Sequence, residues 1–274
     1  MLAAYTVLVE DRLTTAAFAY PLRAGWLAAP GVMLRPHVSA ADSAAAPLAL
    51  VDSVEARSLL RSHVIVREVA VAARRATMLT LATSTRPDEV GHVTASLAGV
   101  SQAGRAVAVI VIPEFYGISV ENWTQQALAP SDATIVVQED AAALIAIDDE
   151  ESYQEDLGRA WFLLTDLPFV SHVCLARRDI LTTDPEGLAA ALGHLHAARD
   201  LSRSRGRELR RDLSKDLGVE REVLADALAD QTLYLGTEEQ QGLEELWKRT
   251  GLPLSAAEAR GAFVSVRPRY SSSS

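Results

Sequence analysis

The sequence predicts an α/β protein built around buried strands, and two observations carry this prediction. Residues Phe169–Ala176 form an almost wholly apolar run without glycine or proline, which is typical of a strand buried on both faces in a parallel sheet. Elsewhere, short apolar strands precede helix starts such as Asp184-Pro185-Glu186, where a capping carboxylate is followed by proline at the first helical position. Helical spacing then dominates as far as Thr250.

Length, composition and charge limit the classes of function. With 274 residues the chain has room for one large domain or for two lobes of about 100–150 residues each. Hydrophobic residues make up 49% of the chain, which supports a globular core. The net charge of −10 argues against nonspecific nucleic-acid binding, because such binding needs a basic surface. A locally positive cleft would still accept an anion.

The sequence shows no export signal, no membrane-spanning segment and no metal-binding motif. The N-terminal stretch lacks the basic and apolar regions of a secretory signal, and no apolar run approaches the roughly 20 residues that span a bilayer. We therefore expect a cytoplasmic protein with no membrane partner. Cys174 is the only cysteine and is interpreted as a buried apolar residue rather than a nucleophile. No His, Cys, Asp and Glu cluster has metal-ligand spacing, so we expect no metal and no cofactor. Nothing in the sequence indicates the oligomeric state.

Strands and helices alternate through the first third of the chain. Strands are expected at residues 5–10, 31–38, 48–51, 64–72 and 77–83, with helices at 16–24 and from 53 to 60. Thr14 or Thr15 is expected to cap the first of these helices, and Asp52 or Ser53 the second. A helix that starts just after a strand offers free backbone amides to an anion at the edge of the sheet.

The middle of the chain repeats this organisation. Strands are expected at 93–97, 133–137 and 142–147, and an apolar helix from Ala106 to about Gly117. His172 is the one strongly polar residue of the buried run, so its ring needs a partner or a ligand. Near the end, Thr237 and Gln240 have the spacing of a capping box.

The segment Asp156–Asp179, DLGRAWFLLTDLPFVSHVCLARRD, resembles the menaquinone-pathway chorismate dehydratases (MqnA) and the related dihydroxynaphthoate synthases (MqnD). Ser53-Val54-Glu55 and Phe115-Tyr116-Gly117 are also similar to segments of those proteins. The resemblance implies the two-lobed periplasmic-binding-protein type II fold, in which each lobe is a mixed sheet flanked by helices and the ligand cleft lies between the lobes. We expect lobe 1 to contain residues 1–86 and 180–274, and lobe 2 residues 87–179.

The resemblance also implies a small anionic cyclic or aromatic carboxylate as the partner. The candidate ligand-binding residues are Thr14, Thr15, Ser53, Arg75, Ser101, Gln102, Ala103, Gly104 and His172. Each has an ordinary structural interpretation as well: the threonines and Ser53 as helix caps, and Arg75 as a solvated surface arginine. Asp148 matches a family aspartate that we interpret as capping the next turn. No catalytic residue is assigned.

The chain lacks several of the hydrogen-bonding side chains that the family has in its ligand-binding motifs. Thr14 stands where the family has asparagine, and Ala103 and Gly104 replace a Thr-Ser pair. Each lost donor to a developing charge can lower a rate by about 10²–10³.

Two functional hypotheses follow. The first is a chorismate-dehydratase-like carbon–oxygen lyase, which removes water from chorismate to give a carboxyvinyloxy-benzoate. The alternative is a catalytically impaired or noncatalytic cytoplasmic binding protein for a small aromatic carboxylate. A transcription-factor effector domain is a third possibility, although the chain lacks attached DNA-binding helices.

Overall fold

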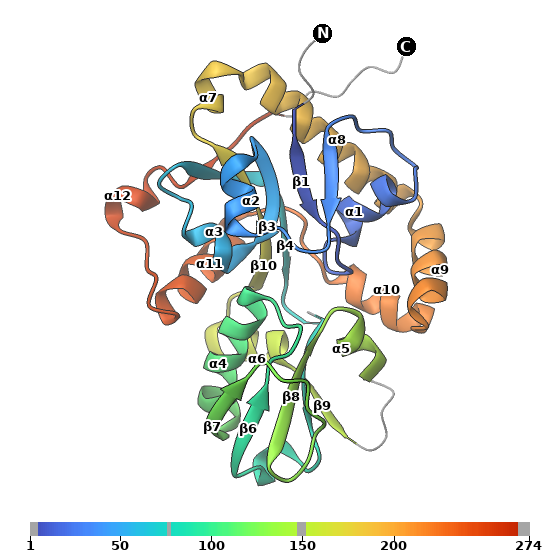
Figure 1. Ribbon diagram of the computed structural model, residues 1–274, viewed down its shortest axis with the longest axis vertical. Coiled ribbons are helices and arrows are strands. Elements are labelled where there is room, and N and C mark those ends of the chain that lie inside the picture. The colour runs from blue at the N-terminus through green and yellow to red at the C-terminus, as the bar shows by residue number, and fades with distance from the viewer. Residues whose placement is uncertain (1–4, 76–77, 147–151, 268–274) are drawn as a thin grey trace.

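The computed structural model describes residues 5–75, 78–146 and 152–267, and it consists of two lobes that each contain a sheet (Figure 1). The larger lobe has a six-stranded sheet and most of the helices, and the smaller lobe has a five-stranded sheet. Both sheets are mixed and are flanked by helices, which confirms the predicted fold class. Among the described residues, no helix has the length and apolar character needed to cross a membrane.

The sheet of the larger lobe contains six strands. In spatial order its strands are β11 (Phe263–Val264), β4 (His63–Ala73), β10 (Phe169–Arg177), β3 (Leu48–Asp52), β1 (Val7–Glu10) and β2 (Val32–Arg35). Because β1 runs parallel to both β2 and β3, these three strands end at the same edge of the sheet. That edge faces the smaller lobe (Figure 1).

The smaller sheet comes from one continuous stretch of chain. Its strands, in spatial order, are β7 (Ser119–Thr124), β6 (His92–Ser96), β8 (Thr134–Glu139), β5 (Leu79–Thr83) and β9 (Tyr153–Asp156). β6 is parallel to its two neighbours, whereas β5 is antiparallel to its own.

Helices cover the faces of both sheets. They are α1 (Ala16–Arg23), α2 (Ala40–Ala45), α3 (Ser53–Arg57), the 3-10 helix η1 (Pro87–Glu89), α4 (Gln102–Tyr116), α5 (Ala141–Ala146), α6 (Leu157–Thr165), α7 (Ile180–Thr183), α8 (Pro185–Ser204), α9 (Gly206–Leu217), α10 (Arg221–Ala229), α11 (Thr237–Arg249) and α12 (Ala256–Ala259). Apolar side chains buried between these helices and the sheets form the core of each lobe.

Strand β10 is buried on both faces, as its apolar sequence predicts, but it is antiparallel to both of its neighbours, β3 and β4. The prediction of a parallel environment for this strand was therefore wrong. An apolar run reports that both faces of a strand are covered, and covering helices can accompany either strand direction.

Three local predictions were also wrong. Residues 142–147 were expected to form a strand, but Ala141–Ala146 form helix α5, because a short apolar run does not distinguish the two. Thr237 is the first residue of α11, and Gly236 occupies the N-cap without a side-chain bond, so the capping box is absent. Helix α4 begins at Gln102 rather than at residue 106.

The strands divide between the lobes earlier than the expected boundaries at residues 86 and 179. β5 pairs in the smaller sheet and β10 in the larger one, so the crossings lie between Ala73 and Leu79 and between Thr165 and Phe169. Asp148 lies outside the described residues.

The C-terminal helices contact both lobes. On one flank, Leu246 of α11 belongs to the core of the smaller lobe, while the adjacent Trp247 is buried in the larger lobe. On the other flank, Leu209 and Leu213 of α9 share a cluster with Leu144 of α5. In Figure 1, α11 and α9 lie on opposite sides of the molecule, so apolar contacts link the lobes on both sides.

Candidate functional site

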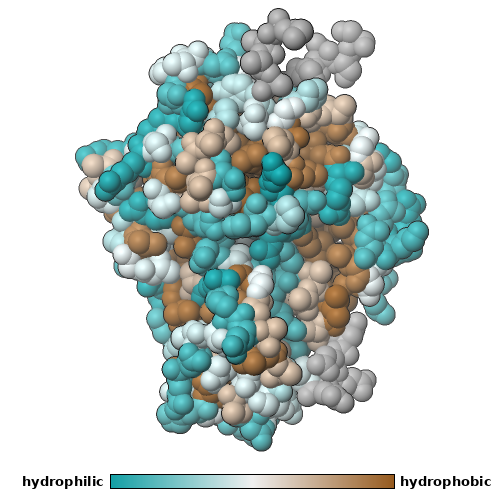
Figure 2. Space-filling model, in the orientation of Figure 1, coloured by the Kyte–Doolittle hydropathy of each residue, from teal (hydrophilic) through white to brown (hydrophobic). Residues whose placement is uncertain are grey.

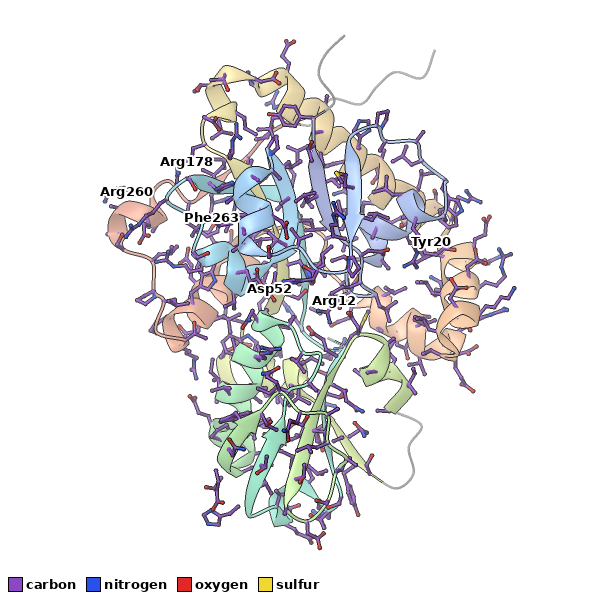
Figure 3. All side chains as sticks on the ribbon, viewed as in Figure 1. Arg12, Tyr20, Asp52, Arg178, Arg260 and Phe263 are labelled. Carbon is purple, nitrogen blue, oxygen red and sulfur yellow. The ribbon has the colours of Figure 1, made fainter. Side chains whose placement is uncertain are left out.

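A cleft of about 400 Å³ lies between the lobes, where β1 and β3 end and α4 begins. Its lining residues are Glu10, Arg12, Pro36, His37, Asp52, Glu55, Gly99, Val100, Ser101, Gln102 and Arg105. Figure 3 shows Arg12 and Asp52 at the junction of the two lobes, and on the same face Figure 2 shows mainly hydrophilic residues at this level. The volume lies in the range of small-molecule sites.

The topology explains why acidic residues gather here. Glu10 is the last residue of β1 and Asp52 the last residue of β3, and the carboxyl ends of neighbouring parallel strands meet at one edge of a sheet. Ligands of open α/β folds bind at such an edge. The other wall is the first turn of α4, contributed by the smaller lobe.

Asp52 joins the two walls. Its Oδ1 accepts hydrogen bonds from the amides of Val54 at 2.8 Å and Glu55 at 3.0 Å, and thereby caps α3. Its Oδ2 accepts a bond of 2.8 Å from the amide of Ala103 in α4. Burial raises the pKa of Asp52, and these three amides oppose that effect. A carboxylate of the protein therefore occupies the amide that was expected to hold a ligand carboxylate.

A second set of contacts crosses the cleft beside the first. Arg12 Nη2 donates to Glu139 at 2.9 Å, and Arg12 Nε donates to Asp140. The amide of Thr14 also donates to Asp140, at 2.9 Å. Glu139 in turn accepts bonds of 2.6 Å and 2.8 Å from the amide and hydroxyl of Ser101. The contacts of Arg12 and Thr14 join the two lobes, and the bonds of Ser101 to Glu139 anchor the N-cap of α4 within the smaller lobe.

Glu10, His37 and Glu55 form an array on the wall contributed by the larger lobe. His37 Nδ1 lies 3.7 Å from Glu10 Oε1, and His37 Nε2 lies 3.4 Å from Glu55 Oε1. Glu10 is fully buried, whereas the side chain of His37 is 58% exposed. Burial raises the pKa of Glu10 to about 7, against the opposing effects of Arg12 and His37.

Arg105 provides a cation that forms no ion pair within the part of the chain that the structure describes. It lines the cleft from α4, and its Nε is buried with no hydrogen-bond acceptor among the described residues. A guanidinium in this state is suited to a carboxylate, which it binds through two parallel bonds. The cleft thus combines acidic groups on one wall with an available cation on the other.

Four of the predicted site residues lie at the start of α4. Ser101 and Gln102 line the cleft. Ala103 and Gly104 are buried, and a Cβ on Gly104 would come within 2.8 Å of Val100 Cγ1 and 3.2 Å of Glu139 Oε1. Glycine at position 104 therefore lets α4 pack against these neighbours.

The predicted threonines act within the protein. Thr14 bonds to Asp140 through both its amide and its hydroxyl. Thr15 occupies the N-cap of α1 but makes no capping bond, because its hydroxyl donates to the carbonyl of Glu10 instead. The expectation that a threonine hydroxyl caps this helix was wrong.

The other three candidates lie outside the lining of the cleft. The buried hydroxyl of Ser53 donates to the carbonyl of Val170 at 2.7 Å. His172 is fully buried in β10, with Nδ1 3.1 Å from Ser171 Oγ. Arg75 is exposed and lines a separate hollow beside Asp230 of the segment after α10.

Sequence reasoning missed Glu10, His37 and Arg105 as a set. Their positions lie far apart in the chain, and only the fold brings them to one cleft. One signal was available for Glu10, because an acidic residue that ends a buried strand of an α/β fold lies at the edge where ligands bind. Among the described residues, no group of three or more His, Cys, Asp and Glu side chains could hold a metal ion.

Comparisons with known proteins agree with this architecture. Protein AF1704 from Archaeoglobus fulgidus superimposes with a TM-score of 0.65 at 12% identity, covering 92% of this chain and 98% of that one. The Candida albicans CA3427 gene product, described as having the generic periplasmic binding protein fold, gives a TM-score of 0.68 at 12% identity, with 98% of each chain covered. The alkanesulfonate-binding protein SsuA from Xanthomonas axonopodis, bound to MOPS, gives 0.65 at 13% identity, covering 96% of this chain and 99% of that one.

The sequence itself identifies the family. No curated protein matches the chain. A family profile described as menaquinone biosynthesis matches residues 39–251, which include α3, α4 and the whole smaller lobe. The chain therefore belongs to the menaquinone biosynthesis family and has the fold of the periplasmic binding proteins.

Proposed function

We propose that this chain is a chorismate-dehydratase-like carbon–oxygen lyase that binds a small cyclic carboxylate between its lobes. The observation that carries the proposal is the cleft of about 400 Å³ with Arg105 on its wall, whose Nε is buried and has no acceptor among the described residues. Family membership supports the reaction class. A cytoplasmic location and a small anionic cyclic or aromatic carboxylate as the partner are parts of the same proposal.

The walls of the cleft suit such a ligand in orientation as well as charge. Arg105 lines the cleft from the smaller lobe, whereas Glu10, His37 and Glu55 line it from the larger lobe. Burial of Glu10 and Asp52 makes that wall a poor place for a second unpaired anion. The ligand carboxylate is therefore held from the side of α4.

The direct test is incubation of the purified protein with chorismate, followed by chromatographic detection of the carboxyvinyloxy-benzoate. An authentic chorismate dehydratase serves as the positive control. Product formation above the rate in buffer supports the lyase. Absence of both product and binding would reject chorismate as the ligand.

Arg105→Gln tests the anchor. A charge-assisted hydrogen bond contributes about 1.5–3 kcal/mol, so we expect the Kd for chorismate, measured calorimetrically, to rise about 10–100-fold. Arg159→Gln is the matched control, because Arg159 is an exposed arginine of the same lobe outside the cleft. Equal affinities of the two variants would exclude Arg105 as the anchor.

A second candidate function is a noncatalytic binding protein for a small aromatic carboxylate. It is favoured by the occupation of the α4 amides, since Ser101 and Ala103 donate to Glu139 and Asp52 of the protein itself. Fewer donors then remain for a charge that develops during reaction. Tight binding of chorismate without product would support this candidate over the lyase.

A further inference from the structure

A hollow of about 480 Å³ lies at the corner where α8 ends and α9 begins. Four arginines line it, Arg203, Arg205, Arg207 and Arg210, and none of them lines the cleft between the lobes. Figure 1 places α9 at the edge of the molecule, and Figure 2 shows a hydrophilic surface there. The hollow is therefore separate from the site of the proposed reaction.

This corner reverses the charge balance of the chain. Residues 199–215 contain seven of the 26 Lys and Arg residues but only three of the 36 Asp and Glu residues. Each of the three acids forms an ion pair with an arginine of the same stretch: Asp200 with Arg199, Glu208 with Arg205, and Asp212 with Arg211. Within the described part of the chain, Arg203, Arg207 and Arg210 form no ion pair. Their charges remain available to an anion from outside.

Two contacts hold arginines of this corner in place. The guanidinium of Arg205 lies 4.0 Å from the centroid of the Trp26 ring and also pairs with Glu208. Arg210 Nη1 lies against the backbone of Gly206, where a Cβ would come within 3.2 Å of it. Glycine at position 206 thus leaves room for the Arg210 side chain over the start of α9. Side chains that are already placed lose less conformational entropy when a ligand binds.

A partly apolar hollow adjoins these arginines. It has a volume of about 320 Å³ and shares Arg203 and Arg210 with the first hollow. Its other lining residues include Leu209, Leu228 and Leu233. Both volumes lie in the range of small-molecule sites. Together the two hollows offer cations at one end and apolar side chains at the other.

We propose that this corner is a second ligand site, which binds a soluble phosphate ester. Its phosphate contacts Arg203, Arg207 and Arg210, and its apolar group occupies the adjoining hollow. A phosphate carries about two negative charges at pH 7 and three acceptor oxygens, and a guanidinium binds such oxygens through two parallel bonds. A carboxylate carries a single charge and matches three unpaired cations less well. The site does not depend on the lyase function.

The test is calorimetric titration of the full chain with phenyl phosphate and with inorganic phosphate. We expect one-to-one binding of phenyl phosphate, and weaker binding of inorganic phosphate because it leaves the apolar hollow empty. Arg203→Gln and Arg210→Gln should each raise the Kd for phenyl phosphate about 10–100-fold, which is the loss expected for a charge-assisted hydrogen bond.

Arg260→Gln is the matched control for the loss of one positive charge. Arg260 is exposed at the end of α12, and Figure 3 shows it on the side of the molecule opposite to α9. This variant should bind phenyl phosphate as tightly as the wild type. Arg105→Gln, which changes the cleft between the lobes, should do the same.

Each other outcome overturns the inference in a distinct way. Absence of phenyl phosphate binding overturns the second site and leaves the proposed lyase untouched. An equal loss of affinity in Arg260→Gln would show a general response to charge, and a loss in Arg105→Gln would place the phosphate in the cleft. Equal affinities for the two phosphates would exclude the apolar hollow from the site. Co-sedimentation with vesicles that contain phosphatidic acid would assign the arginines to a lipid headgroup and overturn the soluble ester.

Discussion

Individual buried residues of this protein have ionisation properties set by their position in the sheet. His172 lies in β10 between β3 and β4, and its Nε2 has no hydrogen-bond partner among the described residues. Burial lowers the pKa of His172 to about 3, with a smaller effect of Arg12 in the same direction. The ring is therefore neutral in the folded protein at pH values where an unfolded chain would bind a proton.

This makes His172 a source of acid sensitivity. Below the ordinary histidine pKa of about 6.5, the unfolded state takes up a proton that the folded state does not, so stability falls as the pH falls from about 6.5 toward 3. One such group contributes up to about 1.4 kcal/mol per pH unit. We expect His172→Asn, compared with wild type by urea unfolding at pH 7 and pH 5, to lose this part of the slope. His92→Asn, at an exposed site, should keep it; identical slopes for all three proteins would contradict the argument.

At the scale of elements, the side chain of Asp52 connects α3 of the larger lobe to α4 of the smaller lobe at the cleft. Asp52 caps α3 with one oxygen and binds α4 with the other, so one side chain sets the distance between two helices from different lobes. The position of Asp52 at the end of β3 fixes the starting point of both interactions.

Asp52→Asn separates these two roles. Asparagine is also a good N-cap, so α3 is retained, but its amide group cannot accept from Ala103 if it presents nitrogen there. We expect a loss of about 1–3 kcal/mol in the free energy of unfolding, because the Ala103 amide is left buried without an acceptor. Asp184→Asn, at a cap that binds Gly187 of its own helix at 2.9 Å, should change stability by only a few tenths of a kcal/mol. A small effect at both positions would show that the contact across the cleft adds little.

The same elements show how far sequence reasoning extends. The burial of β10 and the caps at Asp52 and Asp184 follow from local pattern, because each depends on neighbours within a few residues. The partners of the α4 amides do not, since Asp52 and Glu139 are distant in the chain.

Two strands without a clear hydrophobic pattern could not be predicted from the sequence. Strands β7 and β9 have the sequences SVENWT and YQED, whose polar residues suit the exposed edges of the smaller sheet but give no alternation to detect. Likewise, the direction of β10 depends on where its neighbours lie, and an apolar run contains no information about that.

For the whole molecule, the distinctive feature is that apolar contacts join the lobes on both flanks. Leu246 of α11 is inserted in the core of the smaller lobe, and α9 shares a cluster with α5 on the other side. The ionic contacts of Arg12 lie between these flanks. Wide opening about the two chain crossings would separate all of them.

We therefore expect the lobes to stay close when no ligand is bound, and Leu246→Ala tests this. Removing a fully buried leucine side chain costs about 2–5 kcal/mol, here from a contact that spans the lobes. The ligand-free variant should show a larger radius of gyration in small-angle X-ray scattering, whereas Leu163→Ala, at an exposed position of α6, should match the wild type. An unchanged radius for Leu246→Ala would mean that α11 is not what holds the lobes together.

The discontinuous larger sheet also has a consequence for synthesis on the ribosome. Every strand of the smaller sheet lies between Leu79 and Asp156, so this sheet can pair as soon as that stretch has emerged, although α6 and Leu246 of α11 join its core later. The larger sheet lacks its central strand β10 until Arg177 is made, and β3 and β4 therefore wait with unpaired edges. The half that is translated first is thus completed last, and the nascent chain depends on protection of those edges during the delay.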